Sequence, residues 1–235
     1  MLPLSDVNRA QRFPIATALI VLCNIAVYLA ELSLGEARIL FYQQYGLIPK
    51  LFFSVHAWLE RGFTANALPL LTHMFIHGDL FHIAFNMWFL WVFGDNIEDI
   101  LGSLRFVVFY LLCGMCAALG NALFTFASAT PVIGASGAVS GVMGAYLILF
   151  PLARIRTLVP IFFFLPVIAE VPAFLFIGMW FLGQVFSGLL SFGQYTGIAW
   201  WAHIFGFLGG IYCYLKYFRR RPRPPRVRIR EIPLR

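Results

Sequence analysis

The stretch GASGAVSGVMGAY, from Gly134 to Tyr146, consists almost entirely of small residues, although the chain around it is apolar and bulky. Small residues spaced four apart allow helix backbones to approach closely inside a membrane. Gly137 and Gly141 have this spacing, and Ser136 stands at the start of the run. The stretch therefore predicts a membrane helix that packs tightly against a partner helix and carries a hydroxyl in its first turn.

The composition of the whole chain is that of a membrane protein. Of its 235 residues, 61% are hydrophobic and only 11% are charged, whereas soluble proteins carry about 25% charged residues. Apolar runs of about 20 residues recur, which is the length that crosses about 30 Å of hydrocarbon as a helix. We therefore expect an all-α polytopic membrane protein, because backbone groups in lipid must be satisfied internally.

Six membrane-spanning helices are predicted within a single membrane domain, 14–218. A long loop, 35–78, is too polar to span and too apolar to lie free in water, so we expect short amphipathic helices at the outer interface. A second segment, 157–170, is rich in proline and is expected to be extended at the interface. The predicted spans are 14–34, 79–97, 104–127, 136–150, 172–190 and 198–218.

The distribution of Lys and Arg predicts the orientation of these spans. One side of the membrane receives most of the basic residues, including a tail, 219–235, that holds eight arginines. The other side receives only Arg38, Lys50 and Arg61. The positive-inside rule places both termini, 1–13 and the tail, in the cytoplasm. The tail follows an apolar span directly and contains prolines, so we interpret it as a disordered juxtamembrane segment and expect no nucleic-acid partner.

Two polar residues inside the predicted spans lie at the same depth. Ser136 is 14 residues from Phe150, at the cytoplasmic end of its span, and His203 is 15 residues from Phe218, at the same end of another. At 1.5 Å per residue these separations are about 21 and 22 Å. Taken alone, the serine is an ordinary N-cap residue and the histidine a hydrogen-bonded core residue. Matched depth makes a functional pair the alternative, because polar groups within a membrane are costly.

Small residues on the two helices supply the means to bring this pair together. One helix carries Gly137, Gly141 and Gly144, and the other carries Ala202, Gly206 and Gly210 at four-residue spacing. If these stripes face each other, Ser136 and His203 come within hydrogen-bonding distance. A hydroxyl beside an imidazole is a nucleophile beside its general base.

A third polar group lies in the stretch LTHMFIHGDLFHIAFN, from Leu71 to Asn86. His82 and Asn86 are four residues apart on one helix face, and either side chain could donate to a developing oxyanion. His73 and His77 have the same spacing and are expected to brace the first loop, with a metal site as the alternative. The carboxylates lie elsewhere: the stretch GDNIED, 94–99, is expected in a solvated turn and Glu170 is expected to cap a helix. A two-residue dyad without an acid is therefore predicted.

Together these residues resemble the rhomboid family of intramembrane serine proteases. Gly134-Ala135-Ser136-Gly137 matches the G-x-S-G motif around the family's nucleophile, and His82-x-x-x-Asn86 matches its H-x-x-x-N motif. Ala202-His203-x-x-Gly206-x-x-x-Gly210 matches its A-H-x-x-G-x-x-x-G motif. The three motifs occur in the family's order over about 70–218. Any one of them is weak evidence, but the ordered set is specific.

The resemblance implies a six-helix bundle with a water-filled cavity open to the outside. It implies Ser136 as nucleophile, His203 as general base, and an oxyanion hole formed by His82, Asn86 and the backbone N–H of Ser136, with Gly134 shaping the adjoining loop. It also implies single-span membrane proteins as substrates, cut in or near their spans. Two positions depart from the family: Leu68-Pro69 replaces a common W-R pair, and Ser140 replaces a tyrosine found one turn after the nucleophile.

We therefore predict a serine endopeptidase that needs no metal and no cofactor and whose partners are the lipid bilayer and its substrates. A prokaryotic plasma membrane is the expected location. Two alternatives remain: a non-catalytic relative that only binds membrane spans, and a transporter or channel. The first usually lacks the serine or the histidine, and the second usually has charged residues or broken helices at mid-membrane. The natural substrate and the oligomeric state do not follow from the sequence.

Overall fold

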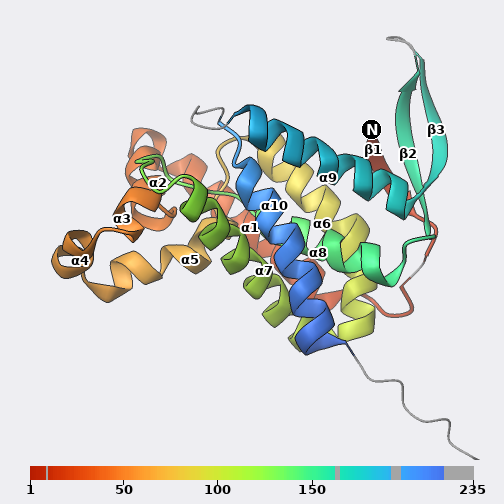
Figure 1. Cartoon of the computed structure of the whole chain (residues 1–235), viewed down its shortest axis with the longest axis horizontal. Helices are drawn as coiled ribbons and strands as arrows, with labels where there is room; N and C mark the ends of the chain where they lie inside the picture. Colours follow the sequence, from red (N-terminus) through yellow and green to blue (C-terminus); the bar gives the residue numbers. More distant parts are fainter. Residues whose placement is uncertain (9, 162–164, 192–196, 220–235) are drawn as a thin grey trace, which may run out of the picture.

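The computed structural model describes residues 1–8, 10–161, 165–191 and 197–219, most of which are helical (Figure 1). The predicted disordered tail, apart from Arg219, lies outside the described residues. The elements in chain order are β1 (Leu2–Asp6), α1 (Ile15–Ser33), η1 (Gly35–Ala37), α2 (Arg38–Tyr45), α3 (Pro49–Phe52), α4 (Val55–Ala67), α5 (Pro69–Thr72), η2 (His73–Phe75), α6 (Leu80–Leu101), α7 (Ser103–Phe124), α8 (Ser136–Leu149), β2 (Arg154–Ile161), β3 (Leu165–Pro172), α9 (Ala173–Leu190), α10 (Trp200–Cys213) and the π-helical turn η3 (Tyr214–Phe218).

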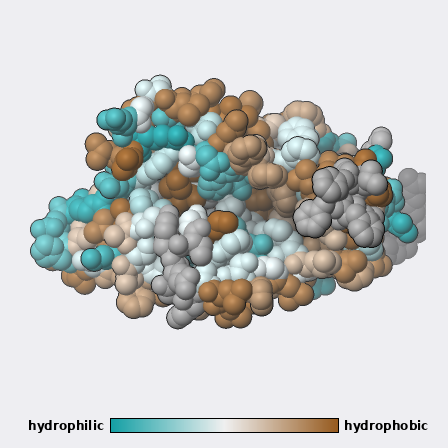
Figure 2. Space-filling model, turned by 90° about the horizontal axis from the view of Figure 1, so that it is seen from above, coloured by the Kyte–Doolittle hydropathy of each residue, from teal (hydrophilic) through white to brown (hydrophobic). Residues whose placement is uncertain are grey.

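A helix lies in each of the six ranges predicted to span the membrane. Three of them, α1, α7 and α9, are long and apolar enough to cross a bilayer by length and composition. Helices α8 and α10 have 14 residues each, or about 21 Å. Many apolar side chains on α1 and α9 are exposed, among them Leu22 (60%) and Phe186 (65%). Figure 2 shows one face on which hydrophobic side chains cover much of the surface, as expected of a multi-pass membrane protein.

Helix α6 is longer than predicted, and the expected solvated turn at 94–99 is wrong. The helix continues to Leu101, and the side chains of Asn96 and Glu98 are buried. The carboxylate of Glu98 accepts hydrogen bonds from the backbone N–H groups of Ala16 and Thr17, both at 2.8 Å. These are unpaired donors in the first turn of α1, where a carboxylate is favourable. Glu98 therefore fixes the start of α1 against the end of α6.

Helix α8 lies at the centre of the bundle, in contact with α6, α7, α9 and α10. Its residues from Gly137 to Tyr146 are all buried. A Cβ on Gly206 would overlap the carbonyl oxygen of Gly137, and a Cβ on Gly210 would overlap that of Gly141. The two stripes of small residues therefore face each other, and α8 and α10 pack with their backbones in contact.

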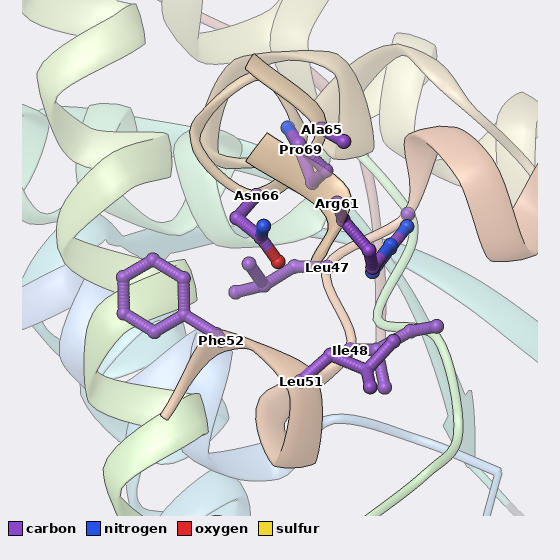
Figure 3. A pocket seen from close by; sticks show the side chains of 9 residues that line it. Leu47, Ile48, Leu51, Phe52, Arg61, Ala65, Asn66 and Pro69 are labelled. Carbon is purple, nitrogen blue, oxygen red and sulfur yellow. The ribbon is translucent and has the colours of Figure 1, made fainter. Parts of the chain in front are cut away.

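The first loop, 35–78, forms short helices at one side of the bundle, at the left of Figure 1. Short helices were predicted here. A small cavity among Leu47, Phe52 and Asn66 (Figure 3) has a volume of about 10 Å³, which is room for about one water molecule. A more open hollow of about 350 Å³ lies near Val7 and Arg154. Neither is lined by Ser136 or His203.

An antiparallel sheet of order β1-β2-β3 departs from the predicted all-α fold. The extended conformation predicted for 157–170 is present in the described parts of that range, 157–161 and 165–170, but the pairing of β2 with the N-terminal strand was not predicted. Glu170 does not cap α9, because Pro172 occupies the N-cap position and Glu170 lies 3.7 Å from Arg154 on the neighbouring strand. Strand β1 is held to the bundle by Asp6, which accepts a hydrogen bond from the hydroxyl of Tyr146 at 2.7 Å.

Candidate active site

The hydroxyl of Ser136 and the imidazole of His203 lie in direct contact. The Nε2 atom of His203 is 2.9 Å from the Oγ atom of Ser136. Helix α8 contributes the serine and α10 the histidine, and the backbone contact between Gly137 and Gly206 holds these helices at the required separation. The arrangement can transfer a proton from the hydroxyl to the imidazole, which is the first requirement of a serine nucleophile.

The ordinary interpretation of Ser136 as a helix cap does not describe its side chain. Ala135 occupies the N-cap position of α8, and no side-chain cap hydrogen bond is formed there. One turn later, Ser140 donates its hydroxyl to the carbonyl oxygen of Ser136 at 2.6 Å. Two serines on one helix therefore have different environments: Ser140 bonds to its own backbone, and Ser136 faces an imidazole.

His82 and Asn86 lie beside the loop that precedes Ser136. Gly134 has φ +119°, and a Cβ at this position would lie 2.5 Å from Nε2 of His82 and 3.8 Å from Nδ2 of Asn86. Both the backbone conformation and the close approach of His82 therefore require glycine. The amide nitrogen of Asn86 is buried and has no hydrogen-bond partner among the described residues. An unpaired buried donor needs an explanation, and a ligand oxygen would provide one.

His73 and His77, at the end of the first loop, support the segment that precedes Ser136. The backbone N–H of Gly134 donates to the carbonyl oxygen of His73 at 2.8 Å, and the N–H of Ala135 donates to Nε2 of His77 at 3.4 Å. Burial lowers the pKa of His73 to about 4, and burial together with the neighbouring imidazole of His82 lowers that of His77 to about 3. Both side chains are therefore neutral near pH 7 and act as hydrogen-bonding braces.

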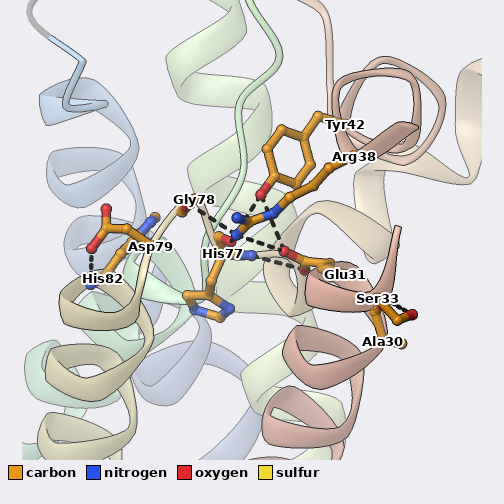
Figure 4. A network of polar contacts seen from close by, with 9 residues as sticks. All are labelled: Ala30, Glu31, Ser33, Arg38, Tyr42, His77, Gly78, Asp79 and His82. Atoms are coloured by element: carbon orange, nitrogen blue, oxygen red, sulfur yellow. Dashed lines mark hydrogen bonds and ion pairs between the residues drawn. The ribbon is translucent and has the colours of Figure 1, made fainter. Parts of the chain in front are cut away.

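A network centred on Arg38 anchors the His77–Gly78 segment to α1 (Figure 4). The guanidinium group donates to the carbonyl oxygens of His77 and Gly78, both at 3.0 Å, and lies 3.5 Å from the carboxylate of Glu31. Glu31 also accepts from the N–H of His77 at 3.1 Å. Burial and the nearby carboxylate raise the pKa of Tyr42, which donates to Glu31, to about 12. This network provides loop anchoring in a chain that has Leu68-Pro69 in place of the W-R pair.

Sequence reasoning missed Gln184 on α9. Its Oε1 atom lies 2.7 Å from Nδ1 of His203. Gln184 is not a carboxylate, but a polar amide within the apolar stretch FLGQVFS was a detectable signal. Two aromatic rings lie near His203, those of Trp180 and Trp200, each with its centroid 6.1 Å from that of the imidazole. Trp201, next in the chain to Trp200, stacks on Phe124.

Comparison with known proteins gives a family match that covers Ser136, His203 and Gln184. A model of the rhomboid domain matches residues 64–220. A rat protein named presenilin-associated rhomboid-like protein, mitochondrial, is 35% identical over 120 residues, covering 47% of this chain and 32% of that protein. The rhomboid protease GluP of Bacillus subtilis is 40% identical over 78 residues, covering 33% of this chain and 15% of that protein. The rhomboid protease GlpG of Yersinia pestis is 26% identical over 136 residues, covering 58% of this chain and 43% of that protein. The matched segment thus spans less than half of each of these relatives.

Proposed function

Because this chain belongs to the rhomboid family, we propose that it is an intramembrane serine endopeptidase that cleaves single-span membrane proteins with a dyad of Ser136 and His203. The observation that carries the proposal is the 2.9 Å contact between the serine hydroxyl and the imidazole. The relatives named rhomboid proteases support proteolysis as the reaction class. A non-catalytic relative that only binds membrane spans would not require a hydroxyl in contact with an imidazole within a bundle of apolar helices.

The proposed reaction begins when Nε2 of His203 takes the proton of Ser136 and Oγ attacks the carbonyl carbon of the scissile peptide. The resulting oxyanion accepts hydrogen bonds from the backbone N–H of Ser136, the side chain of His82 and the amide of Asn86. The imidazolium of His203 then gives its proton to the leaving amine and the peptide C–N bond breaks. Water, activated by the same imidazole, hydrolyses the acyl-enzyme and restores the serine.

Topology and location are part of the proposal. We assign six spans to α1, α6, α7, α8, α9 and the pair α10–η3, with both termini in the cytoplasm and the first loop outside. This orientation rests on the positive-inside rule. A prokaryotic plasma membrane stays the predicted location. The relatives include a protein named mitochondrial as well as bacterial proteases, so they do not select one membrane.

A fluorophosphonate tests the dyad directly, because it phosphonylates activated serines and reacts poorly with ordinary ones. We expect the purified protein in detergent to be labelled on Ser136, as read by peptide mass spectrometry, and Ser136→Ala to be unlabelled. Ser140→Ala is the matched control, one turn away on the same helix, and should keep its labelling. His203→Ala retains the hydroxyl but should lose most labelling, because the base is gone.

Cleavage itself is tested in proteoliposomes with a panel of single-span proteins, compared between the wild type and Ser136→Ala. Cleavage should depend on Ser136. Cleavage by the Ser136→Ala protein, or strong labelling of the His203→Ala protein, would refute the dyad. Absence of both labelling and cleavage in the wild type would favour a non-catalytic member of the family.

A further inference from the structure

The amide of Gln184 is held between two partners and is 9% exposed. Its Nε2 atom donates to the carbonyl oxygen of Trp180, one turn earlier on α9, at 3.2 Å. Its Oε1 atom lies 2.7 Å from Nδ1 of His203. A carbonyl oxygen can only accept, so the NH₂ group must face Trp180. The opposite orientation would bring two acceptors together, and the orientation of the amide is therefore decided by chemistry.

With this orientation, the protonation state of His203 is also decided. The Oε1 atom of Gln184 can only accept, so Nδ1 of His203 must carry a proton. In the neutral imidazole the other nitrogen, Nε2, then has the free lone pair. That lone pair faces Oγ of Ser136 at 2.9 Å. The chain of contacts from Trp180 to Ser136 therefore selects the tautomer that a general base needs.

We propose that Gln184 is a positioning residue that holds His203 in the Nδ1–H tautomer and in the ring orientation that accepts the proton of Ser136. This inference rests on the proposed proteolytic function and adds to the dyad a third, uncharged partner. It also explains why no acid is needed. A carboxylate beside a neutral imidazole in an apolar bundle would be a buried charge without a counter-charge, which is costly, whereas an amide orients the ring without that penalty.

The surroundings of His203 leave Gln184 as the residue that contacts its Nδ1. Ser136 approaches the other nitrogen from α8, and His82 on α6 lies beside Gly134, in the loop before Ser136. Helix α7, which also packs against α10, presents Ala117 and Gly120 at the contact. Within the part of the chain that the structure describes, no carboxylate forms a hydrogen bond or ion pair with His203.

Two variants separate positioning from a structural role. Gln184→Met keeps the length of the side chain and removes the acceptor, and we expect kcat to fall about 10- to 100-fold with little change in KM, because a general base contributes about 10²- to 10⁴-fold in total. Gln184→Glu keeps an acceptor toward Nδ1 of His203 but loses the donor to the carbonyl oxygen of Trp180, so it should recover part of the turnover that Gln184→Met loses. Its carboxylate favours the imidazolium, so the acidic limb of kcat/KM against pH should move to higher pH. Gln44→Met, on the exposed face of α2, is the control and should match the wild type.

The tautomer is read independently of activity by ¹⁵N NMR of histidine-labelled protein, with the His203 signals assigned by their loss in His203→Gln. In the wild type, and equally in Ser136→Ala, the proton should reside on Nδ1, and in Gln184→Met the Nε2–H form should appear. If Gln184→Met does not fold, Gln184→Asn, which shortens the reach of the acceptor, replaces it.

The inference is overturned if the variant without the acceptor keeps wild-type turnover and the Nδ1–H tautomer. It is also overturned if Gln184→Met and Gln184→Glu lose activity equally with an unchanged acidic limb, because that result indicates packing alone. Failure of the proposed function looks different: Ser136→Ala would still cleave substrate, while the tautomer measurement would continue to report on Gln184.

Discussion

At the scale of single residues, Asn86 and His82 carry the sharpest prediction. The buried amide nitrogen of Asn86 has no partner among the described residues, and His82 lies against Gly134, next to the proposed nucleophile. If both donate to the oxyanion, replacing either with alanine removes an interaction made mainly in the transition state. We expect kcat to fall about 10²- to 10³-fold in each variant with KM nearly unchanged, measured with a single-span substrate in proteoliposomes.

The matched control for this prediction is Asn66→Ala. Asn66 is also a buried asparagine, but its amide donates to the carbonyl oxygens of Ala57 and Gly62 within the first loop. Its replacement should lower stability more than turnover. Wild-type kcat in the double variant of His82 and Asn86 would contradict their role as oxyanion donors.

At the scale of elements, the close packing of α8 against α10 predicts that an added methyl group between the two helices is destabilising. A single methyl group on Gly206 would meet the carbonyl oxygen of Gly137, and backbone cannot move aside as a flexible side chain can. Gly206→Ala should therefore lower the free energy of unfolding by about 1–3 kcal/mol and reduce turnover, because His203 is displaced from Ser136. Unfolding in mixed detergent and cleavage assays would measure the two effects.

Gly178 on α9 provides the comparison for this substitution. A Cβ there meets nothing within 4 Å, so Gly178→Ala should be neutral or stabilise the helix by about 0.5–1 kcal/mol. If Gly206→Ala and Gly178→Ala had the same free energy of unfolding and the same turnover, close packing of α8 on α10 would not be what positions His203 beside Ser136.

At the scale of the whole molecule, the junction between the first loop and the bundle predicts how stability depends on pH. Burial holds the pKa of His73 at about 4 and that of His77 at about 3, below the value of about 6.5 in an unfolded chain. Below pH 6.5 the unfolded state therefore binds more protons than the folded state. Stability should be complete above about pH 6.5 and fall as the pH drops toward 4, by about 1.4 kcal/mol per pH unit for each histidine.

Thermal unfolding in detergent between pH 7 and pH 4 would measure this slope. His73→Gln keeps a donor for the carbonyl oxygen of Pro69, with which His73 now bonds at 2.9 Å, but cannot titrate. In this variant the free energy of unfolding should depend less steeply on pH, because the contribution of His73 is removed. A stability that does not change across this range would contradict neutral, buried histidines at the junction.

The sequence by itself determined the features that follow from local chemistry and from the membrane. Hydrophobic runs located the long helices to within a few residues, because each span must bury its own backbone hydrogen bonds in lipid. Equal distances from the membrane surface put Ser136 and His203 at one depth, and the glycine stripes indicated which faces meet. The 2.9 Å contact between Ser136 and His203 agrees with this spacing argument, because an α-helix has a known rise per residue.

The tertiary structure alone decided the contacts between residues that no local pattern connects. Gln184 reaches His203 from a neighbouring helix, Glu98 accepts from the N–H of Ala16, 82 residues earlier in the chain, and β1 pairs with β2, which follows α8 in the chain. Each of these polar groups satisfies a partner chosen by the packing of helices against one another. Hydropathy and spacing describe one helix at a time, and the partner of a buried polar group is set only when several helices are brought together.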